Sequence, residues 1–204
     1  MEEQIMNMPA VALRGLTILP GMIAHFDISR ERSLRAVEEA MEQDQKIYLV
    51  TQRNVDSEDP TQEDLYQMGI VADIKQVVRL QNDVVRILVD GISRAALLGF
   101  TGNEKYLEAE ICYCDSNADS LPEDLREAML LGVREAFHRY AAVVGKISKE
   151  LIRQIDQYED LEKLIDYVTN NLPVSYELKQ QVLEAEDIND RYQVIVSLLL
   201  SQVE

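Results

Sequence analysis

The sequence predicts an α+β protein in which a β-rich half precedes a helical half. Over residues 1–116, apolar residues come in short runs rich in β-branched side chains, and Gly, Asn and Asp separate them, which is typical of strands and turns. From Pro122 onward the apolar residues follow helical spacing. The polar segment "DSNADS" (115–120) is the expected joint. We therefore expect two domains, 1–116 and 117–204.

The first half contains the pattern of about six short strands, which favours a small barrel or sandwich. Two hairpins are expected within it. The first joins its strands at "QND" (81–83), and the second at "TGNEK" (101–105). The predicted strand segments are "AVALRGLTIL", "KIYLVTQ", "GIVADIKQVVRL", "VVRILVDG", "RAALLGF" and "YLEAEICYC".

One helix interrupts these strands at "SRERSLRAVEEAMEQ" (29–43). Leu34, Val37 and Met41 fall on one face of it, so we expect it to cover an open end of the sheet. Ser29 is the expected N-cap. Further on, Thr61 and Asp64 have the spacing of a capping box at a short helical turn.

The second half predicts four or five helices packed as a bundle. Ser120 and Glu123 have capping-box spacing at the start of the first helix, and Pro173 is expected to end a later one. The last segment, "QVIVSLLLSQVE", stays apolar and helical to its end without a stop signal. That pattern suggests a fragment of a longer protein, or a helix that ends at a natural C-terminus.

Composition and charge restrict the function classes. Hydrophobic residues make up 47% of the 204 residues and charged residues 28%, which is typical of a globular protein. No apolar stretch has the length of a membrane span, and the N-terminus is acidic, so we expect a cytoplasmic protein with no membrane contact. The net charge is −17, with −9 in residues 1–116 and −8 in residues 117–204. Direct binding to nucleic acid is therefore not expected.

The sequence gives no support for catalysis or metal binding. Gly145-Lys146 is not a phosphate-binding loop, because Ile147 stands where Ser or Thr is required. Neither G-x-S-x-G nor H-E-x-x-H occurs. Cys112 and Cys114 lie two residues apart, but we interpret them as ordinary thiols rather than zinc ligands. We expect no catalytic residue, no metal site and no cofactor in this chain.

The apolar segment "TILPGMI" (17–23) is unusual because a Pro-Gly turn signal stands in its middle. In one interpretation Leu19, Met22 and Ile23 are core residues and Pro-Gly merely bends a strand. In the other, Pro20, Met22 and Ile23 form an exposed rim that binds other proteins, because flexible Met suits varied partners. Leu80, beside the expected hairpin turn, is a second apolar residue where a polar one would be usual, and we expect it to join the same patch. The candidate binding residues are therefore Pro20, Met22, Ile23 and Leu80.

The order of these segments resembles the N-terminal, substrate-binding domain of Lon, the ATP-dependent serine protease (endopeptidase La). The likeness is collinear over residues 9–112, from "ALRGLTILPGM" through "DPTQEDLYQMGIVADIKQVVRL" and "ILVDGISRAALLGF" to "YLEAEI". The helical half is similar in "YVTNNLPVSYELKQQVLEAEDINDRYQVIVSLL". Ser29 departs from the family pattern, in which Gly is common before the helix.

The resemblance implies a PUA-like, six-stranded twisted β-barrel with one helix, followed by an α-helical subdomain that leads toward an ATPase module. It implies that the chain recognises unfolded or misfolded proteins for degradation and is not itself an enzyme. ATP, Mg²⁺ and the Ser-Lys protease chemistry would belong to modules outside this chain. The other implied partners are further Lon subunits in a homohexamer. Two alternatives remain, an assembly element of that hexamer or a stand-alone Lon-like adaptor.

Overall fold

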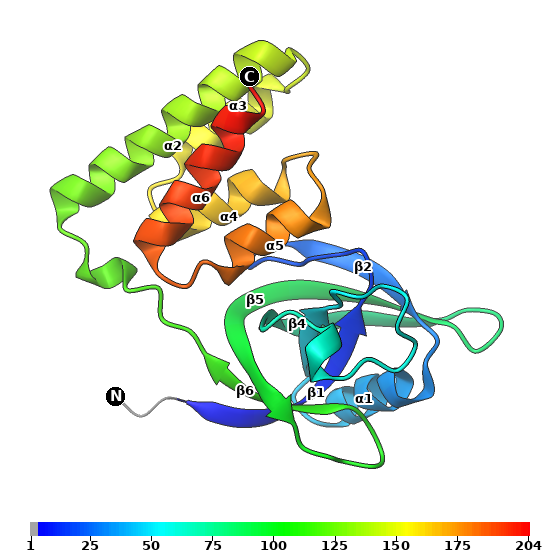
Figure 1. Ribbon diagram of the computed structural model, residues 1–204. Helices are drawn as coiled ribbons and strands as arrows, with labels where there is room; N and C mark the ends of the chain where they lie inside the picture. Colours follow the sequence, from blue (N-terminus) through cyan, green and yellow to red (C-terminus); the bar gives the residue numbers. More distant parts are fainter. Residues whose placement is uncertain (1–3) are drawn as a thin grey trace. The chain divides into compact units, whose positions relative to one another are not determined.

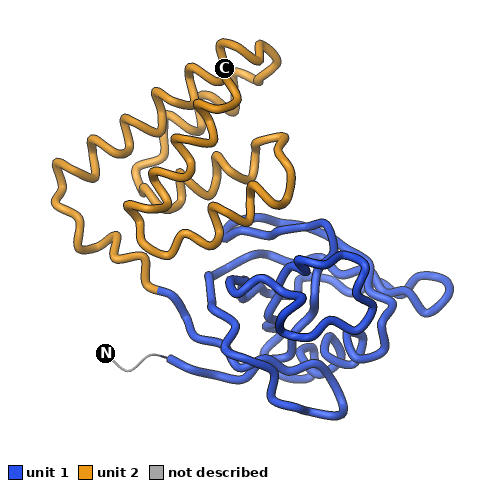
Figure 2. Tube along the Cα trace, viewed as in Figure 1, with its two compact units in different colours: residues 1–114 blue, residues 115–204 orange. Residues whose placement is uncertain are grey.

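The computed structural model describes residues 4–204 and consists of two compact units, which we describe separately. Unit 1 ends at Cys114 and unit 2 begins at Asp115 (Figure 2). Unit 1 holds all the described strands (Figure 1). They are β1 (Ile5–Leu13), β2 (Ile23–Ile28), β3 (Lys46–Thr51), β4 (Met68–Arg79), β5 (Val85–Phe100) and β6 (Glu108–Tyr113).

The strands of unit 1 form a single sheet in the order β2-β5-β4-β3-β1-β6, and β6 also pairs with β5. Five strands therefore close into a ring, and β2 extends the sheet beside the first half of β5. All pairs are antiparallel except β1 with β3. The α+β class and a six-stranded β unit are confirmed. The strand β2 lies at 23–28, where no strand was predicted, and residues 16–19 of the predicted segment "AVALRGLTIL" lie outside the strands. Ring closure removes sheet edges, which otherwise attract foreign strands.

Strand β5 differs from the expectation of two separate strands at 84–91 and 94–100. It runs unbroken for 16 residues because its pairing with β4 continues past Gly91, with a register shift opposite Val71 and Ala72. Such bulges bend a strand without ending it, so β5 pairs with β2 in its first half and β6 in its second. The hairpin at "QND" is confirmed: Leu80 N–H donates to Val84 O over 2.8 Å.

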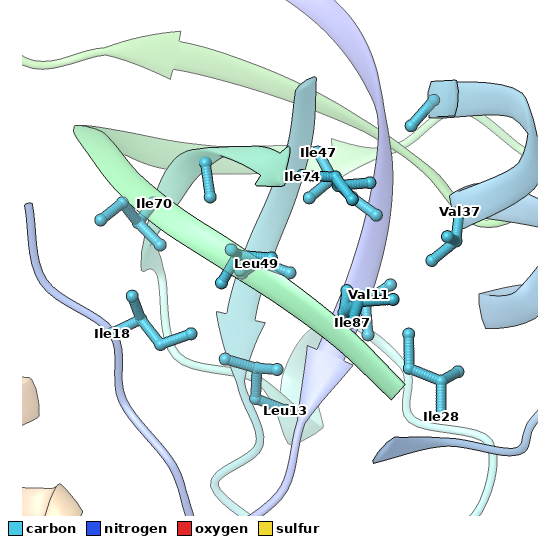
Figure 3. Packing of buried hydrophobic residues seen from close by; sticks show 13 residues of the cluster. Val11, Leu13, Ile18, Ile28, Val37, Ile47, Leu49, Ile70, Ile74 and Ile87 are labelled. Atoms are coloured by element: carbon cyan, nitrogen blue, oxygen red, sulfur yellow. The ribbon is translucent and has the colours of Figure 1, made fainter. Parts of the chain in front are cut away.

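Two apolar clusters stabilise unit 1. The first lies between the strands and helix α1 (Glu31–Glu42), and Figure 3 shows it from close by. The second includes Tyr48, whose hydroxyl donates to the Ala95 carbonyl over 2.9 Å. Burial raises the pKa of Tyr48 far above its ordinary value, so this hydroxyl remains a donor. Of the three residues predicted on the packing face of α1, Val37 is buried in the first cluster and Leu34 packs against it, whereas Met41 is 37% exposed.

The helix start was not predicted correctly. Arg30, not Ser29, occupies the N-cap position, and no side chain caps the helix. The short helix η1 (Gln62–Asp64) does have the predicted capping box: the Asp64 carboxylate accepts from the Thr61 N–H over 3.0 Å.

Unit 2 consists of a short turn, η2 (Ala118–Ser120), and five α-helices, as expected from the helical spacing. The helix that starts the unit has Pro122 at its N-cap without a side-chain bond, so the predicted Ser120–Glu123 capping box is wrong. Pro122 instead supplies a fixed backbone angle at the entry. The predicted stop near Pro173 is confirmed. The helices are α2 (Glu123–Val144), α3 (Lys149–Gln157), α4 (Leu161–Asn170), α5 (Tyr176–Glu184) and α6 (Ile188–Ser201).

The core of unit 2 forms where α2 packs against α4 and α6. Phe137, Ile165 and Ile195 each expose 1% or less of their surface there. Arg191 is also buried, and it donates to the Ala185 and Glu186 carbonyls and to the Glu162 carboxylate. Across residues 4–204, the helices are too short or too polar to cross a membrane.

Candidate functional site

The segment Leu19-Pro20-Gly21-Met22 forms a tight turn at the start of β2. The Met22 N–H donates to the Leu19 carbonyl over 3.1 Å, and Gly21 has φ of +79°. Pro at the second position and a positive φ at the third define a type II turn. The Pro-Gly pair is therefore explained by local geometry, because proline presets the first angle and glycine accepts the second.

Gly91 of β5 fixes this turn. Its carbonyl accepts from the Gly21 N–H over 2.8 Å, and its N–H donates to the Met22 carbonyl over 2.9 Å. The residues before the turn, Ile18 and Leu19, are buried. Figure 3 shows Ile18 beside strand residues of the first core cluster. The turn is thus held rigidly from both sides.

The residues of the turn differ in burial, so the core interpretation applies to only some of them. Leu19 is a core residue, completely buried. Met22 is half-buried and packs against the first cluster, and Pro20 is also half-buried. Ile23 is 68% exposed, more than any other large hydrophobic residue among those described. The turn therefore presents one prominent aliphatic side chain on a rigid base.

The β2–β5 pairing places further residues beside Ile23. Asp90 lies directly opposite it, and Leu88, two residues along β5, lies diagonally across on the same face. Ile92, 42% exposed, lies two residues from Asp90 in the other direction. We name Pro20, Met22, Ile23, Leu88 and Ile92 the turn patch. Sequence reasoning missed Leu88 and Ile92, although the alternation in "RILVDGI" (86–92) indicated which residues face outward.

Polar groups border the turn patch along β2. Asp27 accepts two hydrogen bonds from Arg86, 2.8 and 3.2 Å long. This hydrogen bonding to Arg86 lowers the pKa of Asp27 below its ordinary value. A hollow of about 280 Å³ follows on the same strands, lined by His25, Gln76, Val78, Arg86 and Leu88. An apolar surface with a polar border is typical of an interaction site.

Leu80 does not join this patch. Ile23 pairs with Asp90, whereas Leu80 lies beyond Val85 at the opposite end of the β2–β5 pairing. Five residue steps separate Val85 from Asp90, which corresponds to about 17 Å along the strand. Leu80 is 38% exposed and lines a separate groove of about 470 Å³ between α1 and the β4–β5 hairpin. The candidate residues therefore form two surfaces rather than one.

The His, Cys and acidic side chains of the described residues do not gather into a metal site. Residues 4–204 contain no cluster of three or more His, Cys, Asp or Glu side chains suited to a metal ion. Cys112 and Cys114 are free thiols, and the Cys114 Sγ lies 3.6 Å from the Met68 Sδ. His138 contacts Asp156 over 2.8 Å on an exposed surface. The turn patch differs from these residues because it is an exposed apolar surface.

The architecture defines the class of protein: a closed β-barrel with an added edge strand, followed by a five-helix unit. Residues 7–201 match the family described as "ATP-dependent protease La (LON) substrate-binding domain". The chain therefore belongs to this family, as the sequence resemblance indicated.

Individual relatives agree with this assignment. The chain is 35% identical over 204 residues to the Lon protease of Lachnoclostridium phytofermentans, covering 100% of this chain and 25% of that protein. It is 35% identical over 201 residues to the Lon protease of Clostridioides difficile, covering 97% of this chain and 26% of that protein. The chain thus spans about a quarter of the length of these relatives.

A solved structure shares the fold. The N-terminal domain of the Mycobacterium avium complex Lon protease superposes with a TM-score of 0.77 at 18% identity, covering 96% of this chain and 98% of that one. The strand and helix arrangement described above is therefore that of a Lon N-terminal domain.

Proposed function

We propose that this chain is the substrate-recognition part of an ATP-dependent Lon protease and binds unfolded or damaged polypeptides through the turn patch. The single observation that carries the site is Ile23, 68% exposed at the end of a turn fixed by Gly91. An aliphatic side chain held open to solvent on a rigid base suits the apolar residues that folded proteins hide and unfolded proteins expose. Family membership supports substrate binding as the purpose of this surface.

The expected affinity is low. Burial of roughly 200 Å² of apolar surface at ~25 cal/mol/Å² supplies about 5 kcal/mol, before the cost of association is subtracted. A recognition module needs no more if several copies act together, because linked weak sites give a large gain in avidity. In this proposal the other partners are further Lon subunits in a homohexamer.

The catalytic steps of the parent protein take place outside this chain. ATP, Mg²⁺ and peptide-bond cleavage belong to its ATPase and protease modules, and this chain acts in the cytoplasm without nucleic acid or membrane partners. The net charge of −17 supports the absence of nucleic acid and membrane partners, because a strongly acidic protein repels extended polyanions and anionic lipid surfaces.

The alternative roles, assembly element or stand-alone adaptor, gain no support from the described residues. The apolar stripe of the last helix motivated the assembly role. In the structure, α6 uses Ile188, Ile195 and Leu199 to pack inside unit 2, where each is fully buried. Folding of unit 2 therefore accounts for that stripe.

We expect the double variant Ile23→Ser with Ile92→Ser to weaken binding of a permanently unfolded protein by about tenfold, because it removes apolar area from a weak site. Both side chains are exposed, so the fold should be retained. Isothermal titration calorimetry or fluorescence anisotropy with the labelled unfolded protein measures the change.

The matched control is Leu98→Ser on the second half of β5, where Leu98 is 43% exposed. It should leave the affinity unchanged. Equal affinities for the wild type, the double variant and the control would refute the turn patch as the binding site.

A further inference from the structure

A second pocket of unit 1 lies at the start of α1 and differs from the turn patch in its chemistry. Its volume is about 530 Å³, and the ends of β1 and β2 contribute to its wall. The polar part of the lining comprises Arg14, Arg30, Ser29 and Ser33 together with the acidic residues Asp27 and Glu58. The apolar part includes Phe26 and Leu16.

Two guanidinium groups meet beside this pocket without a carboxylate partner. The Arg30 Nη2 donates to the Gln52 Oε1 over 2.8 Å, and the Arg14 Nε donates to the same oxygen over 3.4 Å. Their other acceptors are the backbone carbonyls of Ala12, Ser57 and Glu58. Among residues 4–204, no Asp or Glu oxygen lies within 4 Å of either guanidinium. Two adjacent positive charges bonded to neutral oxygens favour an anion nearby.

The surroundings of Arg30 lower the pKa of its guanidinium group. Partial burial lowers it below its ordinary value, and the charge of Arg14 lowers it further, whereas Asp59 acts in the opposite direction. Of the other nearby carboxylates, Asp27 is already bound by Arg86, and Glu58 is exposed at the pocket rim.

The first turn of α1 adds donors that have no acceptor. Arg30 occupies the N-cap without a side-chain bond, and the first helical hydrogen bond runs from Leu34 to Arg30. The N–H groups of residues 31–33 therefore find no acceptor among the described residues. Ser33 lines the pocket and is 4% exposed, yet its hydroxyl has no hydrogen-bond partner among residues 4–204. The Ser33 hydroxyl is not one of the fully buried unpartnered atoms of residues 4–204, so it remains accessible from the pocket that Ser33 lines.

We propose that this pocket binds an oxyanion, either a phosphate or a carboxylate, between the Arg30 guanidinium, the Ser33 hydroxyl and the open N-terminus of α1. A helix N-terminus and a guanidinium both favour such a group, and the hydroxyl supplies a third donor. Phe26 and Leu16 leave room for an apolar portion of the ligand beside the charged group. The site lies in unit 1 and its test does not depend on the turn patch.

The test is a titration of the ¹⁵N-labelled chain with sodium phosphate and, separately, sodium acetate, each against sodium chloride at equal ionic strength. Saturable shifts are expected for the amides of residues 31–33 and for the Nε–H groups of Arg14 and Arg30. Shifts with phosphate alone identify a phosphoryl ligand, and shifts with acetate alone identify a carboxylate. Changes that are linear and equal to those with chloride would overturn the proposal.

Single substitutions test which side chains donate hydrogen bonds to the bound anion. Ser33→Ala should weaken binding about fivefold to tenfold, because it removes one charge-assisted hydrogen bond. Arg30→Gln should weaken it by more than about tenfold. The control Arg35→Gln removes the same charge from an exposed position of α1 that does not line the pocket. Since Arg30→Gln also loosens loop contacts, Ser33→Ala decides: an affinity equal to that of Arg35→Gln would contradict the site.

Discussion

Replacement of Gly91 by Ala should lower the free energy of unfolding of unit 1 by about 3 kcal/mol or more. A Cβ at this position would lie 2.4 Å from the Leu19 carbonyl oxygen and 2.8 Å from the Ile70 Cδ1. The first contact is with backbone, which cannot rotate away as a side chain can. Relief requires the turn to move off β5, which breaks the two hydrogen bonds that fix it.

Gly99→Ala on the same strand is the matched control. A Cβ there would meet only the Gln62 Oε1 at 3.6 Å, which is ordinary contact. Urea unfolding followed through the amide signals of β4 and β5 measures both variants. Similar midpoints for the two would show that the turn is not held against Gly91 as described.

Replacement of Phe137 by Ala should destabilise unit 2 by about 3–5 kcal/mol, the usual cost of removing a large buried aromatic side chain. Phe137 is 1% exposed, and its ring centroid lies 5.9 Å from that of Tyr140. It belongs to α2, which packs against α4 and α6, so the cavity would open in the middle of the unit.

Leu131→Ala on the same helix provides the comparison, since Leu131 is 55% exposed. Its effect should stay within about 0.5 kcal/mol, as for other surface substitutions. Hydrogen exchange of the amides in α4 and α6 reports on both variants. Equal protection in the two would contradict the assignment of Phe137 to the core.

Much of the fold could be predicted from the sequence because its signals are local. Short apolar runs rich in β-branched residues predicted β3, β4 and β6, and the "QND" hairpin was located correctly. The continuity of β5 was not predictable, since it depends on the bulge opposite β4, which is a tertiary feature.

The prediction of Ser29 as the N-cap of α1 was wrong for a similar reason. Arg30 is fixed by contacts with Ala12, Gln52 and Glu58, and these place it at the helix start.

The candidate site was predictable only in part. Pro-Gly indicated a turn and the apolar neighbours marked it as unusual, but burial differs sharply between Leu19 and Ile23. The sequence could not show this difference, because Gly91, far along the chain, sets the position of the turn. The placement of Leu80 in the same patch was wrong for the same reason. Only the strand register shows that Leu80 and Ile23 lie at opposite ends of one pairing.

The most direct test of the proposed substrate-recognition function is an NMR titration of this chain with a permanently unfolded protein, with a well-folded protein as control. We expect shifts with the unfolded protein alone, concentrated on Met22, Ile23, Leu88 and Ile92. Shifts elsewhere on the chain would place recognition on another surface. Absence of shifts with either protein would contradict direct substrate recognition by this chain.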